Sequence, residues 1–87
     1  MTRVLIPSQL QSYCGGASSV EAAGATVDEV LLDLDRRFAG IRFRVVDEQD
    51  RIRRHMRIFV GVERAHSIGD AVPPGGEVMI FGALSGG

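Results

Sequence analysis

The chain has 87 residues, of which 45% are hydrophobic and 24% are charged, and its formal net charge at pH 7 is −1. This length suits one domain with a single core, and the composition is that of a folded protein, not of a disordered segment. A net charge so close to zero gives no overall attraction to nucleic acid or to a membrane surface, so we expect neither as a partner.

The chain has one cysteine, Cys14, and all ten of its basic residues are arginines. A single cysteine cannot form the internal disulfides on which small secreted domains usually depend. Residues 1–7 lack the long apolar stretch of a signal peptide, and no apolar run is long enough to span a membrane. We therefore expect a cytoplasmic protein. Without lysine, the chain cannot form lysine-linked polymers of itself.

The first residues predict a hairpin. Residues 4–7 are apolar and predict a short strand, which Pro7 limits because proline donates no hydrogen bond to a sheet. Residues 8–18 predict a polar loop, and residues 19–23 predict a returning second strand.

A helix is predicted over residues 26–38. Thr26 is a favourable N-cap, and Glu29 stands three residues later, as in a capping box. Apolar residues follow at helical spacing and form one stripe: Val27, Val30, Leu31, Leu34 and Phe38. Gly40 is the predicted stop.

The second half predicts three strands. In residues 41–45 apolar side chains alternate with arginines, which predicts a short strand before a charged loop. Residues 55–60 alternate more clearly and predict a strand that Gly61 ends. Turns at residues 69–70 and 73–76 precede a last strand, residues 77–81, whose apolar run predicts burial on both faces.

These elements predict an α+β fold in which one main helix packs across a mixed sheet. A hairpin, a crossing helix and further strands are the layout of a ubiquitin-like β-grasp fold, whose first and last strands are parallel neighbours, although other small α+β folds use the same order. We expect residues 1–81 to form this domain and residues 82–87 to form a flexible tail. The helix should pack on sheet residues of the core: Leu5, Ile58, Val60, Val78 and Ile80.

The sequence resembles the MoaD/ThiS family of ubiquitin-like sulfur carriers, especially its CysO-type branch. The similar segments are Ile6-Pro7 with Leu10 and Gly15-Gly16, residues 25–34 and 38–41, residues 57–60, residues 75–80, and the tail at residues 83–87. Two turns differ from the family pattern, since Gly76 stands where the family usually has Asp and no Asn lies beside Gly61. Both differences concern turn geometry more than function.

The resemblance implies a β-grasp carrier that is itself not an enzyme. It implies that a ubiquitin-activating-type adenylyltransferase uses ATP to adenylate Gly87, and that the product becomes a thiocarboxylate (1-thioglycine). We expect the carrier to bind no cofactor of its own. Leu84, Ser85 and Gly86 would be recognised with the tail, and the other partners would be a sulfur-accepting biosynthetic enzyme and a protease that trims or releases the tail.

The chemistry of the tail agrees with this role. The α-carboxylate of Gly87 is ionised at neutral pH, and neither Gly86 nor Gly87 has a Cβ that would widen the tail in a narrow channel. Extended, residues 82–87 reach about 20 Å, far enough to enter a nucleotide pocket while the domain stays outside. Two alternatives remain: the small subunit of a molybdopterin synthase, and a non-covalent ubiquitin-like binding module for which the tail is dispensable.

Other candidate residues are weaker. Cys14 has no partner cysteine, and His55 and His66 stand at no metal-ligand spacing, so we expect no metal site. A run of arginines between residues 42 and 57 forms either a solvated face or a docking surface for an acidic partner or RNA. For docking of the activating enzyme we select Phe81, Arg57 and Arg64, because the tail must leave the domain beside the last strand.

Overall fold

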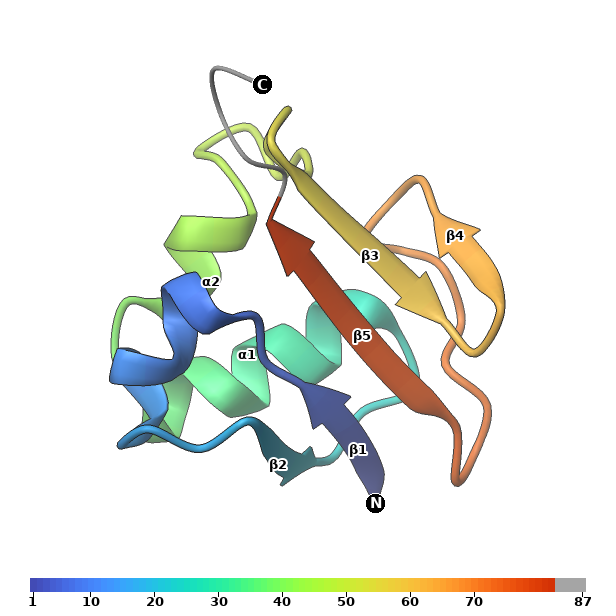
Figure 1. The fold of residues 1–87 in the computed structure, drawn as a ribbon. Helices are drawn as coiled ribbons and strands as arrows, with labels where there is room; N and C mark the ends of the chain where they lie inside the picture. Colours follow the sequence, from blue (N-terminus) through green and yellow to red (C-terminus); the bar gives the residue numbers. More distant parts are fainter. Residues whose placement is uncertain (83–87) are drawn as a thin grey trace.

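The computed structural model describes residues 1–82, which form a mixed five-stranded sheet with helices on one face (Figure 1). The strands are β1 (Thr2–Leu5), β2 (Ser19–Ala22), β3 (Met56–Val60), β4 (Glu63–Ala65) and β5 (Glu77–Gly82). The helices are η1 (Ser8–Cys14), α1 (Val27–Arg37) and α2 (Ile41–Val45).

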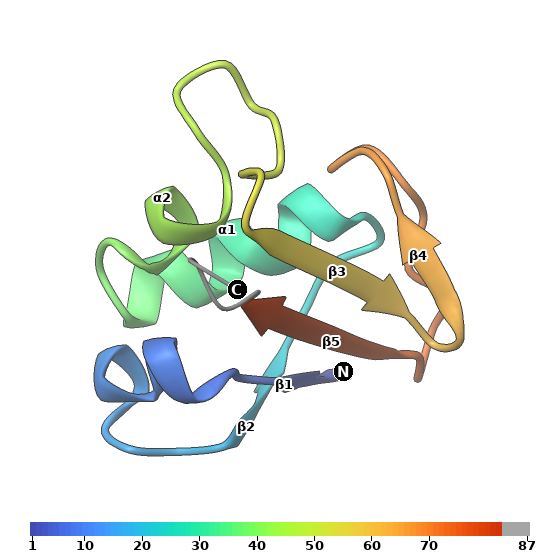
Figure 2. The ribbon, with the colours of Figure 1, turned by 45° about the horizontal axis from the view of Figure 1, so that its top comes forward.

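The strand order is β2-β1-β5-β3-β4, so β5 lies in the centre of the sheet. It runs parallel to β1 and antiparallel to β3. Figure 2 shows these three strands side by side. The predicted parallel pairing of the first and last strands is confirmed, as is the predicted α+β layout of a β-grasp fold.

Helix α1 begins as its capping residues predict. The Thr26 hydroxyl accepts a hydrogen bond from the Glu29 main-chain N–H at 3.1 Å, and the Glu29 carboxylate accepts one from the Ala25 N–H at 2.8 Å. The box therefore reaches one residue further back than the usual form, which returns to the N-cap amide. The first bond satisfies a main-chain donor of the first helical turn, and the second satisfies the donor of the residue just before the N-cap.

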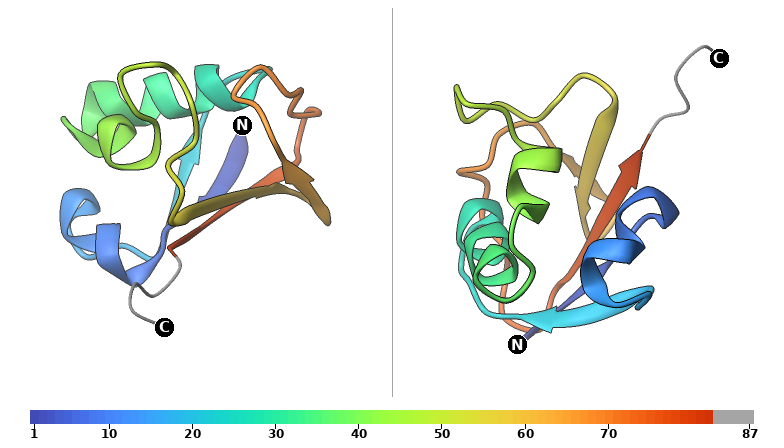
Figure 3. Two further views of the ribbon diagram at one scale, coloured as in Figure 1. Left: turned by 90° about the horizontal axis from the view of Figure 1, so that it is seen from above. Right: turned by 90° about the vertical axis from the view of Figure 1, so that its left-hand side faces the viewer.

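The core lies between α1 and the sheet, and Figure 3 shows these two layers from above. Its largest fully buried side chains are Val4, Val27, Val30, Leu31, Leu34, Ile41, Val45, Val46, Ile58, Val78 and Ile80. Phe38 and Val60 are partly buried and pack against this cluster. The predicted apolar stripe of the helix is thus the face that packs on the sheet.

The prediction that β5 is buried on both faces is wrong. Val78 and Ile80 are buried, but Met79 is half-buried and Phe81 is 47% exposed. Neighbouring side chains of a strand point to opposite faces, and the helices of residues 1–82 cover only one of them. The apolar residues of the other face therefore remain accessible.

The opening strand covers residues 2–5 instead of the predicted 4–7, and its buried face carries Thr2 and Val4. Thr2 and Val4 are 3% and 0% exposed, whereas Leu5 is only half-buried. Because side chains alternate along a strand, burial of Val4 places Leu5 on the outer face. The prediction of Leu5 as a core residue is wrong.

Residues 8–18 are not simply a loop, because residues 8–14 form the 3-10 helix η1. Most residues of this helix are polar, which led to the prediction of a loop, but Leu10 and Cys14 are buried in the core. Gly15 follows with a φ of 64°, the left-handed conformation that commonly ends a helix.

The predicted strand at residues 41–45 is the short helix α2. Ile41 and Val45 are four residues apart and both fully buried, so one helical face places them in the core. The Asp35 carboxylate accepts hydrogen bonds from the N–H groups of Gly40 and Arg42, at 3.0 and 3.1 Å. Gly40, with a φ of 93°, lies in the bend between α1 and α2, three residues beyond the last residue of α1.

Strand β4 was not predicted. It has three residues and pairs with β3 in the register Ile58↔Ala65, Phe59↔Arg64 and Val60↔Glu63. Gly61, with a φ of 61°, lies in the connection between these strands, where we expected β3 to end. A strand this short, with one apolar residue, gives no recognisable alternation.

None of the helices in residues 1–82 is both long and apolar enough to cross a membrane.

The packing of α1 predicts a large loss of stability in Leu34→Ala. Leu34 is fully buried, so truncation should lower the free energy of unfolding by about 2–5 kcal/mol through lost contacts and a cavity. Leu32→Ala is the matched control, because Leu32 lies on the same helix but is 48% exposed. Urea unfolding of both variants measures the difference, and equal midpoints would contradict the packing described here.

Asp33 predicts a pH-dependent link between α1 and β2. The hydrogen bond from the Ala23 N–H, at 2.9 Å, and then the charges of Arg36 and Arg37 hold the pKa of Asp33 below its ordinary value. A lowered folded-state pKa gives stability that is present above the unfolded pKa, about 3.9, and is lost as the pH falls through the folded value.

The stability difference between the natural protein and Asp33→Asn should therefore be largest at neutral pH and shrink on acidification. Thermal unfolding of both proteins at stepped pH measures it. A difference that is constant between neutral pH and the acid range would show that the charge of Asp33 contributes nothing.

Candidate functional site

The central strand β5 determines where the chain leaves the sheet. Val78 and Ile80 anchor it in the core, and its last residue, Gly82, pairs with Met56 of β3. In addition, the side-chain amide of Gln9 in η1 donates a hydrogen bond to the Gly82 carbonyl at 3.2 Å. β5 thus runs one residue into the segment predicted as tail, and its end is held by two elements.

Gly82 is also a point of close approach. A Cβ built at this position would lie 2.4 Å from the Gln9 Nε2 atom, so any larger residue would displace the Gln9 side chain. The Gln9 side chain of η1 therefore lies directly against Gly82, and Figure 2 shows η1 near the end of β5.

The predicted tail residues Leu84, Ser85, Gly86 and Gly87 lie outside the residues that the structure describes. Five residues follow Gly82 in the sequence, and five extended residues span about 17 Å. What the structure contributes to this part of the site is the position and direction of β5, from which the tail departs.

An apolar patch lies on the outer face of the sheet beside this point. We call it the sheet-face patch, and its residues are Leu5, Phe59, Met79 and Phe81. The rings of Phe59 and Phe81 meet edge to face, with centroids 5.7 Å apart and an interplanar angle of 82°. Met79 is the register partner of both Phe59 and Leu5, so the four residues span three neighbouring strands.

The structure brings together the three residues selected for docking. Arg57 is the register partner of Phe81, and Arg64 is the register partner of Phe59. Both arginines therefore flank the sheet-face patch, and Phe81 is its most exposed aromatic residue. Sequence reasoning missed Phe59 and Met79, although both stand at the outward positions of the alternating strands.

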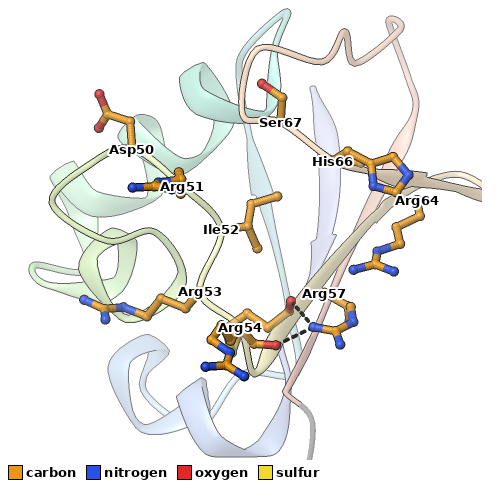
Figure 4. Close-up of a pocket in the computed structure, with 11 residues that line it drawn as sticks. Asp50, Arg51, Ile52, Arg53, Arg54, Arg57, Arg64, His66 and Ser67 are labelled. Atoms are coloured by element: carbon orange, nitrogen blue, oxygen red, sulfur yellow. Dashed lines mark hydrogen bonds between the residues drawn. The ribbon is translucent and has the colours of Figure 1, made fainter.

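The two arginines differ in how they are held. The Arg57 guanidinium donates to the carbonyl oxygens of Arg54 and Met56, at 2.6 and 2.9 Å (Figure 4). The exposed Arg64 side chain makes no hydrogen bond or ion pair within residues 1–82. Arg64 is therefore the more available of the two for a partner's carboxylate.

The remaining candidates form no reactive site in the part of the chain that is described. Cys14 is buried in the core, and burial raises the pKa of its thiol, an effect that the nearby Arg37 partly opposes. This thiol is poorly suited to sulfur relay, because relay needs an accessible thiolate. His55 and His66 are exposed, and no cluster of three potential metal ligands occurs among residues 1–82.

Comparison with known proteins gives consistent results in sequence and structure. No protein-family model matches the chain. The sulfur carrier protein CysO of Mycobacterium tuberculosis is 34% identical over 89 residues, covering 97% of this chain and 96% of that protein.

Two solved structures have the same fold over 97% or more of this chain. The crystal structure of the Amycolatopsis orientalis BexX/CysO complex contains a chain with a TM-score of 0.92 and 36% identity, with both chains covered completely. The crystal structure of M. tuberculosis CysO has a TM-score of 0.90 and 30% identity, covering 97% of this chain and 100% of that one.

Proposed function

Because this chain belongs to the CysO-like group of ubiquitin-like sulfur carriers, we propose that the carboxylate of Gly87 is adenylated by a partner enzyme and converted to a thiocarboxylate. The observation that carries this proposal is the 34% identity to a sulfur carrier over 97% of the chain, together with Gly86-Gly87 as its last residues. The thiocarboxylate then donates its sulfur in biosynthesis, with cysteine formation the first pathway to test.

The reaction needs a partner because a carboxylate is a poor electrophile. The oxygen of the Gly87 carboxylate attacks the α-phosphate of ATP, pyrophosphate leaves, and an acyl adenylate forms. A persulfide sulfur on a donor displaces AMP and gives an acyl disulfide, whose S–S bond a thiol cleaves to release the thiocarboxylate. In this scheme the chain supplies only the carboxylate, whereas the nucleotide is ATP and the persulfide and the thiol come from other molecules, so the chain acts as a cosubstrate and not as the enzyme.

The geometry of residues 1–82 supports separate roles for the domain, which a partner would bind, and for the tail, which carries the reacting carboxylate. The end of β5 is held by Met56 and Gln9, so a partner that grips the domain finds the tail at a defined starting point. The sheet-face patch lies on the same strand and offers exposed apolar area to such a partner. A CysO relative is known from a complex with BexX, and we propose that this chain likewise docks on its enzymes.

The proposed partners follow from the reaction. They are a ubiquitin-activating-type adenylyltransferase that uses ATP, a sulfur-accepting biosynthetic enzyme, and a protease that trims or releases the tail. The first two must both reach Gly87, and both are proposed to read Leu84, Ser85 and Gly86 as they admit the tail.

The docking role of the sheet-face patch predicts a selective defect in Phe81→Ala. Removing an exposed aromatic anchor beside the tail should lower kcat/KM for adenylation about tenfold, mostly through KM. Leu32→Ala is the control, since Leu32 is 48% exposed on α1, which packs on the other face of the sheet. Pyrophosphate release at varied carrier concentration measures both, and equal rates for the two variants would remove the patch from the interface.

The flanking arginines predict a separate, electrostatic effect. Arg57→Glu and Arg64→Glu should slow association with the activating enzyme, and the slowing should weaken as salt is raised. Stopped-flow association at several salt concentrations measures this. Rates equal to those of the natural protein at low salt would show that neither charge faces the enzyme.

The proposed role of Gly87 predicts a specific mass change. With ATP, a persulfide donor, a thiol and the activating enzyme, the protein should gain the mass difference between sulfur and oxygen, located in the C-terminal peptide. Cys14→Ser should gain the same mass, whereas Gly86→Val should react poorly because a β-branched residue widens and stiffens the tail.

Adding one residue after Gly87 should abolish the gain unless a protease first removes the extension, because the reactive carboxyl is then inside a peptide bond. Peptide mapping by mass spectrometry distinguishes these cases. Sulfur found on Cys14, or an unmodified Gly87 alongside an enzyme shown to be active on another carrier, would overturn the proposal.

A further inference from the structure

A pocket of about 590 Å³ lies beside the start of β3, where the loop before β3 faces the end of β4 (Figure 4). We call it the arginine pocket, because five arginines and one histidine line it: Arg51, Arg53, Arg54, Arg57, Arg64 and His66. These residues come from two segments that are brought together by the pairing of β3 with β4.

The positive charge of the arginine pocket is only partly balanced. Asp50 is the one acidic residue among those that line it, and the Asp50 carboxylate is already bound by Arg42 at 3.2 Å. Asp47 lies in the loop beside Arg51 and Arg53. Its pKa is lowered by main-chain hydrogen bonds from Arg51 and Gln49 and by the charges of Arg51 and Arg53, so it offsets those two arginines.

The other arginines keep their charge available. Arg54 and Arg64 are exposed and donate no side-chain hydrogen bond to any of residues 1–82, nor do they form ion pairs there. Arg57 is held by two main-chain carbonyls, which use hydrogen-bond donors but leave its charge uncompensated. The pocket therefore carries net positive charge on a protein whose overall net charge is −1.

The arrangement of the guanidinium groups is unsuited to a compact anion. Arg53 donates to the Phe43 carbonyl at 2.7 Å and lies over the Phe43 ring at 4.5 Å, which turns it away from Arg64. Figure 4 shows the guanidinium groups of Arg51, Arg54 and Arg64 pointing in different directions. A single phosphate needs donors that converge on one point, whereas separated positive groups match carboxylates spaced along a peptide.

The lining also argues against single-stranded RNA. Such ligands are usually held by aromatic side chains on which bases stack, and the pocket contains no Phe, Tyr or Trp. A net charge of −1 for the whole chain further lacks the basic excess typical of nucleic-acid binding.

The position of the pocket indicates which protein would occupy it. Met56 lines the pocket and is the register partner of Gly82, the residue from which the tail departs. Arg57 and Arg64 line the pocket and also flank the sheet-face patch. A protein that covers the patch and takes the tail would therefore lie directly against the pocket.

We propose that the arginine pocket binds a carboxylate-rich segment of the protein that takes the tail. The identity of that partner rests on the proposed function, whereas the preference of the pocket for a chain of carboxylates does not. The pocket would give the carrier a second, charge-based contact beside the apolar one, and so would let a partner select it among similar ubiquitin-like domains.

The test uses the full chain labelled with ¹⁵N and three probes: hexaglutamate, inorganic phosphate and octauridylate RNA. Hexaglutamate should shift the amide signals of residues 51–57 and 64–67, with an affinity that falls as salt is raised. Arg54→Glu should weaken this binding about tenfold, because it removes one attraction and adds one repulsion. Arg44→Glu makes the same charge change on α2 outside the pocket, and it should alter the affinity less than twofold.

Phe81→Ala separates the pocket from the sheet-face patch, because it should leave hexaglutamate binding unchanged. The proposal is overturned if hexaglutamate shifts no pocket signals, if Arg44→Glu weakens binding as much as Arg54→Glu, or if phosphate or the RNA binds more tightly than hexaglutamate. The assay requires no sulfur transfer. If hexaglutamate binds the pocket but Gly87 is not converted to a thiocarboxylate, only the proposed function is refuted. If Gly87 is converted and Arg54→Glu leaves the KM of that reaction unchanged, only the role of the pocket is refuted.

Discussion

The burial of one face of β5 against α1 is the constraint on which the rest of the structure depends. Val78 and Ile80 of this strand lie in the same core as Leu31 and Leu34 of the helix, and all four are at most 2% exposed. This strand has neighbours on both edges, β1 and β3. Its alternate residues then face outward, and its last residue marks the departure of the tail. The accessible patch and the point at which the chain leaves the sheet therefore follow from one packing arrangement.

Much of this arrangement could be predicted from local patterns. Thr26 and Glu29 form a capping box that depends only on nearby residues, and the spacing of Val30, Leu31 and Leu34 has one simple interpretation. The segment at residues 41–45 has two possible interpretations, because the spacing of Ile41 and Val45 fits both the alternation of a strand and the four-residue spacing of a helix. In the structure the Asp35 carboxylate accepts hydrogen bonds from the Gly40 and Arg42 amides at the start of this helix, a contact that no periodicity reveals.

The candidate site shows the same limit. The last two glycines and the place of Phe81 at the end of the last strand are visible in the sequence, but the exposure of Phe81 follows only from the structure, and Phe59 joins the patch only through the register of β3 with β5. The arginine pocket depends on the unpredicted strand β4, which brings Arg64 and His66 opposite the loop that contains Arg54. Surfaces built from segments distant in sequence need the strand pairing before they can be recognised.

In this account the domain presents one reactive carboxylate, and successive enzymes bind its charged and apolar surfaces to reach that carboxylate. The most direct test is the intact mass of the protein isolated from its own cells, followed by fragmentation of its C-terminal peptide. The account predicts a population in which sulfur replaces one oxygen at Gly87 and which disappears when the activating enzyme is deleted. Protein that carries only an ordinary carboxylate at Gly87, in cells whose activating enzyme is present and active, would contradict it.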